Sequence, residues 1–365
     1  MTALRRPDSV LLALFLTICT FGIIVLSSAS SVESFQSLGD PNAMLKKQII
    51  ALLIGLLLMV LVMRLNLDKL RKWYLPLLVG SIFLSILPFI PHIGTQLLGA
   101  KRWILIGGFF FQPSELVKLA LVLFLSTWLI QKQQQFEEPK KALIPLLALL
   151  GTICVILIMQ PDLGTAIVIL GIGMVLYFAA GAPFKHFLWI AMLFVAGLVL
   201  IIQIAPYRAA RLTVFLNPGK DTQGTAYHIN QSLLAIGSGG IFGRGLGHSI
   251  QKFNYLPESA GDSIFAIAAE ELGFILSLCI IALYVGILWR GVTLARRASD
   301  PSTRLLMIGI VSWFTIQAFV NIGALTSLLP LTGEPLPFIS NGGSSLVISL
   351  VGVGILLNAS KTVRV

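Results

Sequence analysis

Asp262 is the residue in this sequence best placed for acid–base chemistry. It is one of 15 acidic residues among 365, and it ends a long polar segment, 207–262. An apolar run of membrane length, 264–289, follows directly and is interrupted only by Glu270 and Glu271. A carboxylate in this position is expected at a water–lipid boundary. There it could take a proton from a bound hydroxyl group, or it could cap the next helix.

Basic residues accompany this carboxylate. The segment 207–262 carries Arg208, Arg211, Lys220, Arg244 and Lys252. A second polar loop, 92–111, carries Lys101 and Arg102. Both segments are expected outside the cell membrane, where basic residues are normally depleted. A polyanionic ligand on the outer face would explain the excess, although loop arginines also contact anionic lipids.

Two charged residues fall inside an apolar run. Glu115 and Lys118 are three positions apart and therefore share a helix face. They could form a neutralising buried ion pair, or they could form a polar site that faces a cavity, as ionisable residues in membrane spans commonly do. The two interpretations are compatible.

Two turns supply further candidates. Asp162 lies in the tight turn Gln160-Pro-Asp-Leu-Gly164, where it could cap the next helix or belong to a site. Ser344 lies at the end of the rigid turn Pro335-Leu-Pro-Phe-Ile-Ser-Asn-Gly-Gly-Ser-Ser345. A helix that begins there would offer free N–H groups to an anion, or the turn could have no ligand. Glu270 and Glu271 are interpreted as partners in hydrogen bonds between helices.

The composition indicates which class of fold positions these residues. The chain is 56% hydrophobic and 11% charged, with a mean hydropathy of +0.92, which excludes an ordinary soluble protein. Its apolar blocks predict an all-α integral membrane protein. The net charge of +11 is assigned to cytoplasmic flanks and not to nucleic-acid binding. The three cysteines lie in apolar runs and are interpreted as core residues.

Ten membrane-spanning helices are predicted within a single domain, 1–365. Lysine and arginine positions place both termini in the cytoplasm and make 207–262 a large extracytoplasmic loop between the seventh and eighth spans. The predicted spans are 10–26, 49–63, 75–90, 113–130, 142–159, 165–180, 187–205, 263–289, 305–328 and 344–357.

An outward-facing polar site of this kind fits two functions. One is a transferase for a lipid-linked, phosphate-bearing substrate, with the carboxylate as general base. The other is a transporter or flippase, whose polar groups would line a pathway. The sequence has no Walker A loop and no His-Glu-x-x-His motif. It also shows no internal repeat of the kind found in many transporters, which favours the enzyme.

Several stretches resemble the SEDS family (shape, elongation, division and sporulation), in order and over nearly the whole chain. They are Gly99-Ala-Lys-Arg-Trp-Ile104, Gln112-Pro-Ser-Glu-Leu-Val-Lys118, Gln160-Pro-Asp-Leu-Gly-Thr165, Tyr207-Arg208, Tyr255-Leu-Pro-Glu258, Asp262, Ile264-Phe-Ala266, Glu270-Glu-Leu-Gly273 and Pro337-Phe-Ile-Ser-Asn-Gly-Gly-Ser-Ser345. Within the family, 206–213 and 245–252 look more like the division branch, FtsW, than the elongation branch, RodA.

The resemblance implies a peptidoglycan glycosyltransferase that polymerises lipid II during cell division. Its implied partners are a class B penicillin-binding protein, other divisome membrane proteins and membrane lipids, with no nucleic acid. The implied location is the bacterial cytoplasmic membrane, at the septum. Lipid II transport and an elongation role of the RodA type are the alternatives.

The resemblance also implies roles for residues. The family's essential aspartate falls on Asp262, although Ala260-Gly261 stands where members usually carry His-Thr, and Ser263 where they usually carry Phe. Asp262 would deprotonate the acceptor hydroxyl in an inverting transfer. A divalent cation, Mg²⁺ or Mn²⁺, would offset charge on the leaving pyrophosphate, with Lys101, Arg102, Arg208, Arg211 and Lys252 as cationic contacts. Glu115, Lys118, Asp162 and Ser344 complete the expected substrate-binding set.

Overall fold

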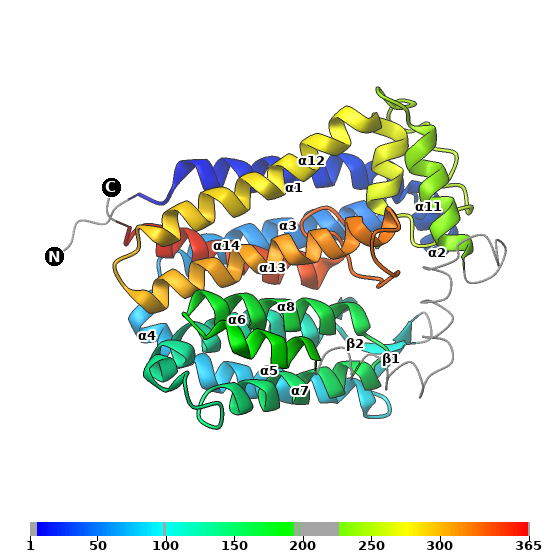
Figure 1. Ribbon diagram of the computed structural model, residues 1–365. Coiled ribbons are helices and arrows are strands. Elements are labelled where there is room, and N and C mark those ends of the chain that lie inside the picture. The colour runs from blue at the N-terminus through cyan, green and yellow to red at the C-terminus, as the bar shows by residue number, and fades with distance from the viewer. Residues whose placement is uncertain (1–5, 98–99, 193–196, 198–225, 364–365) are drawn as a thin grey trace.

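Helices that run the length of the molecule dominate the fold (Figure 1). The computed structural model describes residues 6–97, 100–192, 197 and 226–363. In order along the chain, the helices described are α1 (Ser9–Ala29), α2 (Ser31–Leu38), α3 (Ala43–Val62), α4 (Leu67–Arg71), α5 (Tyr74–Ile86), η1 (Leu87–Phe89), α6 (Pro113–Lys132), η2 (Gln133–Gln135), α7 (Leu143–Met159), α8 (Leu163–Ala179), α11 (Tyr227–Ser238), α12 (Ile264–Arg296), α13 (Pro301–Leu325) and α14 (Gly343–Ser360).

The apolar helices coincide with predicted spans. Within the described residues, α1, α3, α12, α13, α14 and the stretch Pro113–Gln135 are long and apolar enough to cross a membrane. Three shorter apolar helices occupy the places of the third, fifth and sixth predicted spans: Tyr74–Phe89, Leu143–Met159 and Leu163–Ala179. The seventh predicted span, 187–205, lies largely outside the described residues. The multi-span helical fold is therefore confirmed.

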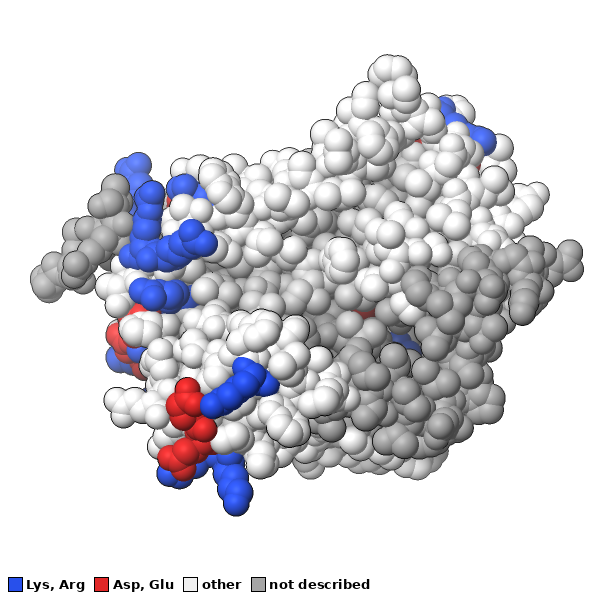
Figure 2. All heavy atoms as spheres, in the orientation of Figure 1, with Lys and Arg blue, Asp and Glu red and all other residues white. Residues whose placement is uncertain are grey.

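The two ends of the bundle differ. Both termini and α4 lie at one end, and α2, α11 and a small sheet lie at the other (Figure 1). On the face drawn in Figure 2, charged side chains gather mainly at the end with the termini, and few are seen across the middle. Ion pairs tie helices together at this end: Arg290 with Asp8, at 2.5 Å, and Arg71 with Asp300. A bare middle between polar ends is the pattern expected of a protein that spans a membrane.

Helix α13 is the centre of the bundle. It packs against α6, α8, α12 and α14, and its most apolar stretch is 72% buried, compared with 22% for α3. Phe314 on α13 packs edge-on against Phe338, with ring centroids 4.9 Å apart. This contact holds the segment between α13 and α14 against the bundle, where it lies beside the candidate site.

Residues 92–111, predicted as a loop, instead contain three antiparallel strands in the order β1 (Gly94–Leu97), β2 (Ala100–Ile106) and β3 (Phe109–Phe111). Gly107 and Gly108, with φ angles of 58° and 84°, join β2 to β3. Two glycines with positive φ between apolar runs are a typical hairpin connection. The prediction of an all-α fold was therefore wrong in this detail.

The eighth predicted span is also not one straight helix. Gly273, with φ 78° and ψ −176°, interrupts α12, so that its first part folds back against the longer remainder (Figure 1). The loop 240–245 inserts at the break, and its Arg244 and Gly245 N–H groups donate to the carbonyl groups of Glu270 and Glu271. The polar loop thus replaces the helical hydrogen bonds that the break removes.

Candidate active site

The Asp262 turn, residues 256–263, is held rigidly against the segment between α13 and α14. The Asn341 N–H group donates to the Ala260 carbonyl at 2.8 Å, and Ser340 Oγ donates to the Gly261 carbonyl at 2.7 Å. Asn321 on α13 donates to the carbonyl groups of both Asp262 and Glu334, at 2.7 Å each. The backbone that carries Asp262 is therefore fixed, while its side chain remains partly exposed.

Asp262 is not the N-cap of α12. The capping position is Ser263, whose side chain makes no capping hydrogen bond. The Ser263 hydroxyl instead lies 3.3 Å from Asp262 Oδ1, 2.8 Å from the Pro257 carbonyl and 2.7 Å from His228 Nε2. The alternative that Asp262 is the N-cap of this helix is therefore wrong, because the capping position is Ser263.

Glu258 is a second carboxylate on the Asp262 turn. Burial, together with the neighbouring charges of Asp262 and Glu33, raises its pKa to about 7. Its carboxyl group lies over Gly261, where an added Cβ atom would be 2.9 Å from Oε2. Glu33 reaches the same turn from α2 and accepts from Ser259 and the Ala260 N–H group. Sequence reasoning missed this cluster because Glu33 is more than 200 residues away in the chain.

A cavity of about 10 Å³ adjoins Asp262. This volume holds at most about one water molecule, so a sugar ring cannot enter it. A substrate would have to approach Asp262 from its exposed side. The cavity is lined by Asp262, Asn321, Ala324, Leu325, Leu331, Thr332, Gly333 and Glu334.

The predicted ion pair of Glu115 and Lys118 is confirmed, with 2.8 Å between Lys118 Nζ and Glu115 Oε1. Both side chains are at most 1% exposed. Lys118 also donates to Gln317 at 2.9 Å and lies 3.8 Å from Glu334 Oε2. Burial raises the pKa of Glu334 to about 7, although Lys118 opposes this shift. We call Glu115, Lys118, Gln317 and Glu334 the buried cluster.

Glu334 and Gln317 were missed in the sequence. Glu334 reaches α6 from the loop after α13, and its Oε1 atom accepts from Thr165 at 2.6 Å. The available signal was an isolated carboxylate in an otherwise apolar turn, 331–339. Such a group needs a buried partner, but its separation of 216 residues from Lys118 concealed which one.

Asp162 has the capping role predicted for it, and it also lies among other polar side chains. Its side chain caps α8 by accepting from the Thr165 N–H group at 3.4 Å. It also lies 3.6 Å from Arg102 and 3.3 Å from Gln112 Nε2. Arg102, on β2, donates in addition to the Gln160 carbonyl at 3.0 Å. Lys101, its neighbour on β2, is exposed.

Ser344 joins two elements at the same end of the bundle. It lies in the first turn of α14, and its hydroxyl accepts from the Gln112 N–H group at 3.2 Å. Gln112 is the residue just before α6 and also contacts Asp162. The residues Arg102, Gln112, Asp162 and Ser344 are thus brought together, whereas Arg208 and Arg211 lie outside the described residues.

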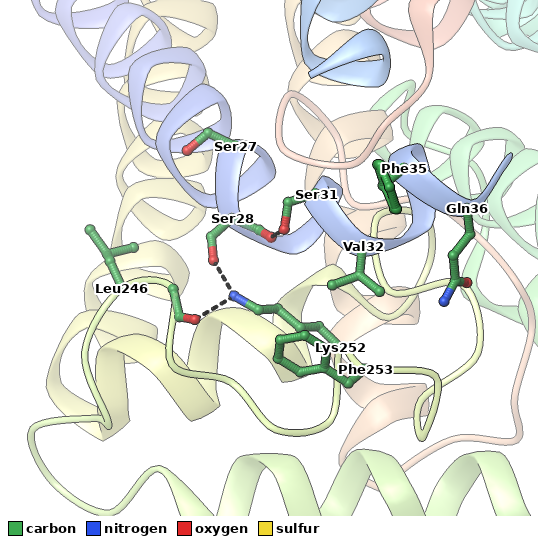
Figure 3. A pocket seen from close by; sticks show the side chains of 10 residues that line it. Ser27, Ser28, Ser31, Val32, Phe35, Gln36, Leu246, Lys252 and Phe253 are labelled. Atoms are coloured by element: carbon green, nitrogen blue, oxygen red, sulfur yellow. Dashed lines mark hydrogen bonds between the residues drawn. The ribbon is translucent and has the colours of Figure 1, made fainter. Parts of the chain in front are cut away.

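Lys252 lies in a different place from the one the sequence suggested. Its ammonium group donates to Ser28 at 2.9 Å and to the Gly247 carbonyl at 2.8 Å (Figure 3). It also donates to Glu271 at 2.9 Å. An ammonium group has three N–H donors, and these contacts use all three. Lys252 therefore fastens the segment that precedes α12 to α1 and α12, beside a cavity of about 620 Å³.

Glu270 and Glu271 have the hydrogen-bonding role predicted for them, but mostly towards the outer loop. Glu270 accepts from Ser249 Oγ at 2.5 Å and from the Ile250 N–H group at 3.1 Å. Glu271 accepts from Ser28 on α1 at 2.7 Å as well as from Lys252. These carboxylates hold the segment 244–252 in place and are not available to a substrate.

Known proteins with similar sequences cover the entire chain. The family model FTSW_RODA_SPOVE, described as cell cycle protein, matches residues 8–365. Stage V sporulation protein E of Bacillus subtilis is 41% identical over 100% of this chain and 99% of its own length. A protein of Geobacter metallireducens named "Probable peptidoglycan glycosyltransferase FtsW" is 40% identical over 99% of this chain and 96% of its own.

Solved structures show the same fold. One, from work on structural coordination of polymerization and crosslinking by a peptidoglycan synthase complex, has a TM-score of 0.80 at 28% identity. It covers 99% of this chain and 98% of its own. The Thermus thermophilus rod shape determining protein RodA has a TM-score of 0.70 at 28% identity, covering 97% of this chain and 96% of its own.

Proposed function

Because the chain belongs to the FtsW/RodA/SpoVE (SEDS) family of cell cycle proteins, we propose that it is a peptidoglycan glycosyltransferase that polymerises lipid II. Several relatives close to 40% identical over nearly their whole length carry that enzyme name with FtsW. The observation in the structure that supports the proposal best is Asp262, a partly exposed carboxylate on a rigid turn that does not cap the following helix.

The proposed reaction is a single inverting displacement. Asp262 accepts the proton of the 4-hydroxyl group of the acceptor N-acetylglucosamine. The freed oxygen attacks the anomeric carbon of the donor N-acetylmuramic acid, and the bond to undecaprenyl pyrophosphate breaks with the electron pair leaving on the phosphate oxygen. The α-linked donor becomes a β-linked glycan. Pyrophosphate is a good leaving group, so no general acid is required.

A divalent cation would supply charge compensation for the pyrophosphate. The described residues contain no group of three or more His, Cys, Asp or Glu side chains arranged to hold a metal ion. They therefore fit a cation that is bound chiefly by substrate phosphates with one or two protein carboxylates, as is common for Mg²⁺. Exposed Lys101 and the Arg102–Asp162 pair are the described groups proposed to contact the charged part of the substrate.

The proposal extends to topology and setting. Ten spans with both termini in the cytoplasm account for the nine apolar helices described and for the charges at the end with the termini. We place the protein in the bacterial cytoplasmic membrane at the division septum, with a class B penicillin-binding protein and other divisome proteins as partners. One solved structure that resembles this chain, with a TM-score of 0.80, comes from work on a peptidoglycan synthase complex. This similarity supports a transpeptidase partner.

Polymerisation of lipid II by the purified protein with its co-purified partner tests the function. We expect glycan strands from the wild type and none from Asp262→Asn. The matched control is Asp40→Asn, which changes an exposed outer carboxylate paired with Lys46 and should leave polymerisation unchanged. Movement of labelled lipid II across vesicles without glycan synthesis would favour the transport function instead.

A further inference from the structure

The hydroxyl group of Ser263 connects a histidine to Asp262. Ser263 Oγ lies 2.7 Å from His228 Nε2, 2.8 Å from the Pro257 carbonyl and 3.3 Å from Asp262 Oδ1. Ser263 is completely buried and, although it occupies the capping position of α12, its hydroxyl does not cap the helix. Its side chain is instead directed to Pro257 and Asp262 of the same turn and to His228 on α11.

Whether His228 Nε2 carries hydrogen determines which group receives the proton of the Ser263 hydroxyl. A serine hydroxyl has one proton to donate and two lone pairs that accept. When His228 Nε2 carries hydrogen, it donates to Ser263 Oγ, and the serine proton is free for Pro257 or Asp262. When Nε2 carries none, Ser263 must donate to His228, and neither Pro257 nor Asp262 receives its proton. The protonation of His228 is thus transmitted to the carboxylate through one atom.

We propose that His228 is a positioning residue for the glycosyl transfer: it donates to Ser263 Oγ and so orients Asp262 and favours its ionised form. This inference rests on the proposed function. His228 lies on α11, which packs against α12 and α13. The contact therefore joins the outer helix α11 to the turn that carries the base, and a second residue of the same turn, Pro257, shares the hydroxyl group.

Within the part of the chain that the structure describes, the charged groups placed around this contact are carboxylates. Asp262 and Glu258 lie on the turn, and Glu33 interacts with Glu258 from α2. Glu334, which follows α13, lines the small cavity with Asp262. On α12, Glu270 and Glu271 are already bonded to the segment 244–252. An imidazolium ion in this position favours the ionised form of Asp262, because an opposite charge nearby stabilises a carboxylate.

The pH dependence of lipid II polymerisation, with the partner present, tests the proposal. In His228→Gln the side chain still donates a hydrogen bond but cannot become charged. We expect its rate at pH 8 to remain within about twofold of wild type, while the acidic midpoint of the activity profile moves up by about 0.5–1 pH unit. The matched control is His248→Gln, since His248 is exposed and contacts the Leu246 carbonyl; its profile should not move.

Removing the hydrogen bond between His228 and Ser263 should lower the polymerisation rate more than His228→Gln does. His228→Ala and Ser263→Ala should each lower the rate at pH 8 by about tenfold, as expected for loss of a hydrogen bond to a charged or polar group. The double variant should be no slower than either single variant, because both remove the same link. Thermal unfolding of each variant shows whether it is folded, and His228→Gln with Ser263→Ala suffices if His228→Ala does not fold.

A His228→Gln profile that superimposes on the wild type, or losses that add in the double variant, would overturn the role of His228. These results are separate from a failure of the proposed function. If Asp262→Asn kept full activity, the general base itself would be wrong. If Asp262→Asn were inactive while His228→Gln matched the wild type, only the role of His228 would be lost.

Discussion

The Asp262 turn and the buried cluster are two groups of carboxylates that the same fold treats in opposite ways. Asp262 is partly exposed, and backbone contacts from Asn321, Ser340 and Asn341 hold its turn. Lys118 and Glu334 are at most 2% exposed, and their side chains contact one another. In the first arrangement the residue that carries the carboxylate is partly exposed, whereas in the second the charged side chains are buried and contact one another.

This difference distinguishes acidic residues that are expected to stabilise the fold of a membrane protein from an acidic residue that is expected to take part in a reaction. A buried charge is tolerated when it is paired, so the cluster is expected to matter for folding. A carboxylate whose backbone is fixed by neighbours can leave its side chain free for a reacting group. Asn321 links the two regions, since it donates to the carbonyl groups of both Asp262 and Glu334. Substitutions in the two regions should therefore affect different measurements.

The largest effect is expected from Asp262→Asn. Loss of a general base lowers a rate by about 10²–10⁴-fold, and the polymerisation rate measures it. The melting temperature should stay close to wild type, because Asp262 does not cap α12. A folded Asp262→Asn protein with at least half of the wild-type rate would contradict the comparison.

Lys118→Met should act on stability. The substitution leaves Glu115 and Glu334 buried without their cation, which costs about 3–5 kcal/mol. The control is Lys185→Met, because the Lys185–Glu137 pair at 2.6 Å is exposed and solvent-exposed pairs contribute little to stability. Thermal unfolding in detergent compares the two variants, and equal melting temperatures would show that burial of the cluster is unimportant.

Gly273→Ala tests the break in α12 that supports the Asp262 turn. Gly273 has φ 78°, and an added Cβ atom would lie 2.2 Å from the Gly243 nitrogen. The strained backbone alone costs about 1–3 kcal/mol, and the overlap adds to it. We expect a clear drop in melting temperature, with Gly151→Ala as the control, since nothing lies within 4 Å of a Cβ atom there. An unchanged melting temperature would indicate that α12 runs straight.

Glu258→Gln should change the pH dependence of stability. The pKa of Glu258 is raised from 4.5 to about 7 in the folded protein, so folding takes up a proton and stability falls as pH rises from about 4.5 to about 7. The full shift corresponds to at most about 3 kcal/mol, and partial solvent screening reduces this to about 1–2 kcal/mol. The variant should gain stability over wild type at pH 8 and not at pH 4, measured by melting temperature. A pH-independent difference would contradict the shift.

The sequence predicted those parts of the site that depend on neighbours along the chain. The Glu115–Lys118 pair follows from the i, i+3 spacing of a helix, and the Asp162 cap follows from its place before an apolar run. The hairpin at Gly107-Gly108 also had a local signal, since two adjacent glycines between apolar runs indicate a hairpin turn, although the stretch 92–111 was interpreted as a loop between spans.

Other parts could not be predicted because their partners are distant in sequence. Glu334 meets Lys118, Glu33 reaches the Asp262 turn, and His228 meets Ser263 only after helices from different parts of the chain pack together. Lys252 was assigned to a substrate from its charge, whereas packing gives all three of its donors to protein acceptors. The charge of a residue and its position in the sequence do not show whether its side chain contacts a substrate or another part of the protein.

The sequence by itself determined that this is a multi-span helical membrane protein with an acidic residue, Asp262, at the start of an apolar run. Hydropathy and local spacing determine such features, because helices in lipid satisfy their own backbone hydrogen bonds. Only the tertiary structure decided which carboxylates are buried with charged partners and which one is partly exposed. That choice depends on burial and on partners brought from distant segments, and it left Asp262 accessible while enclosing Glu334.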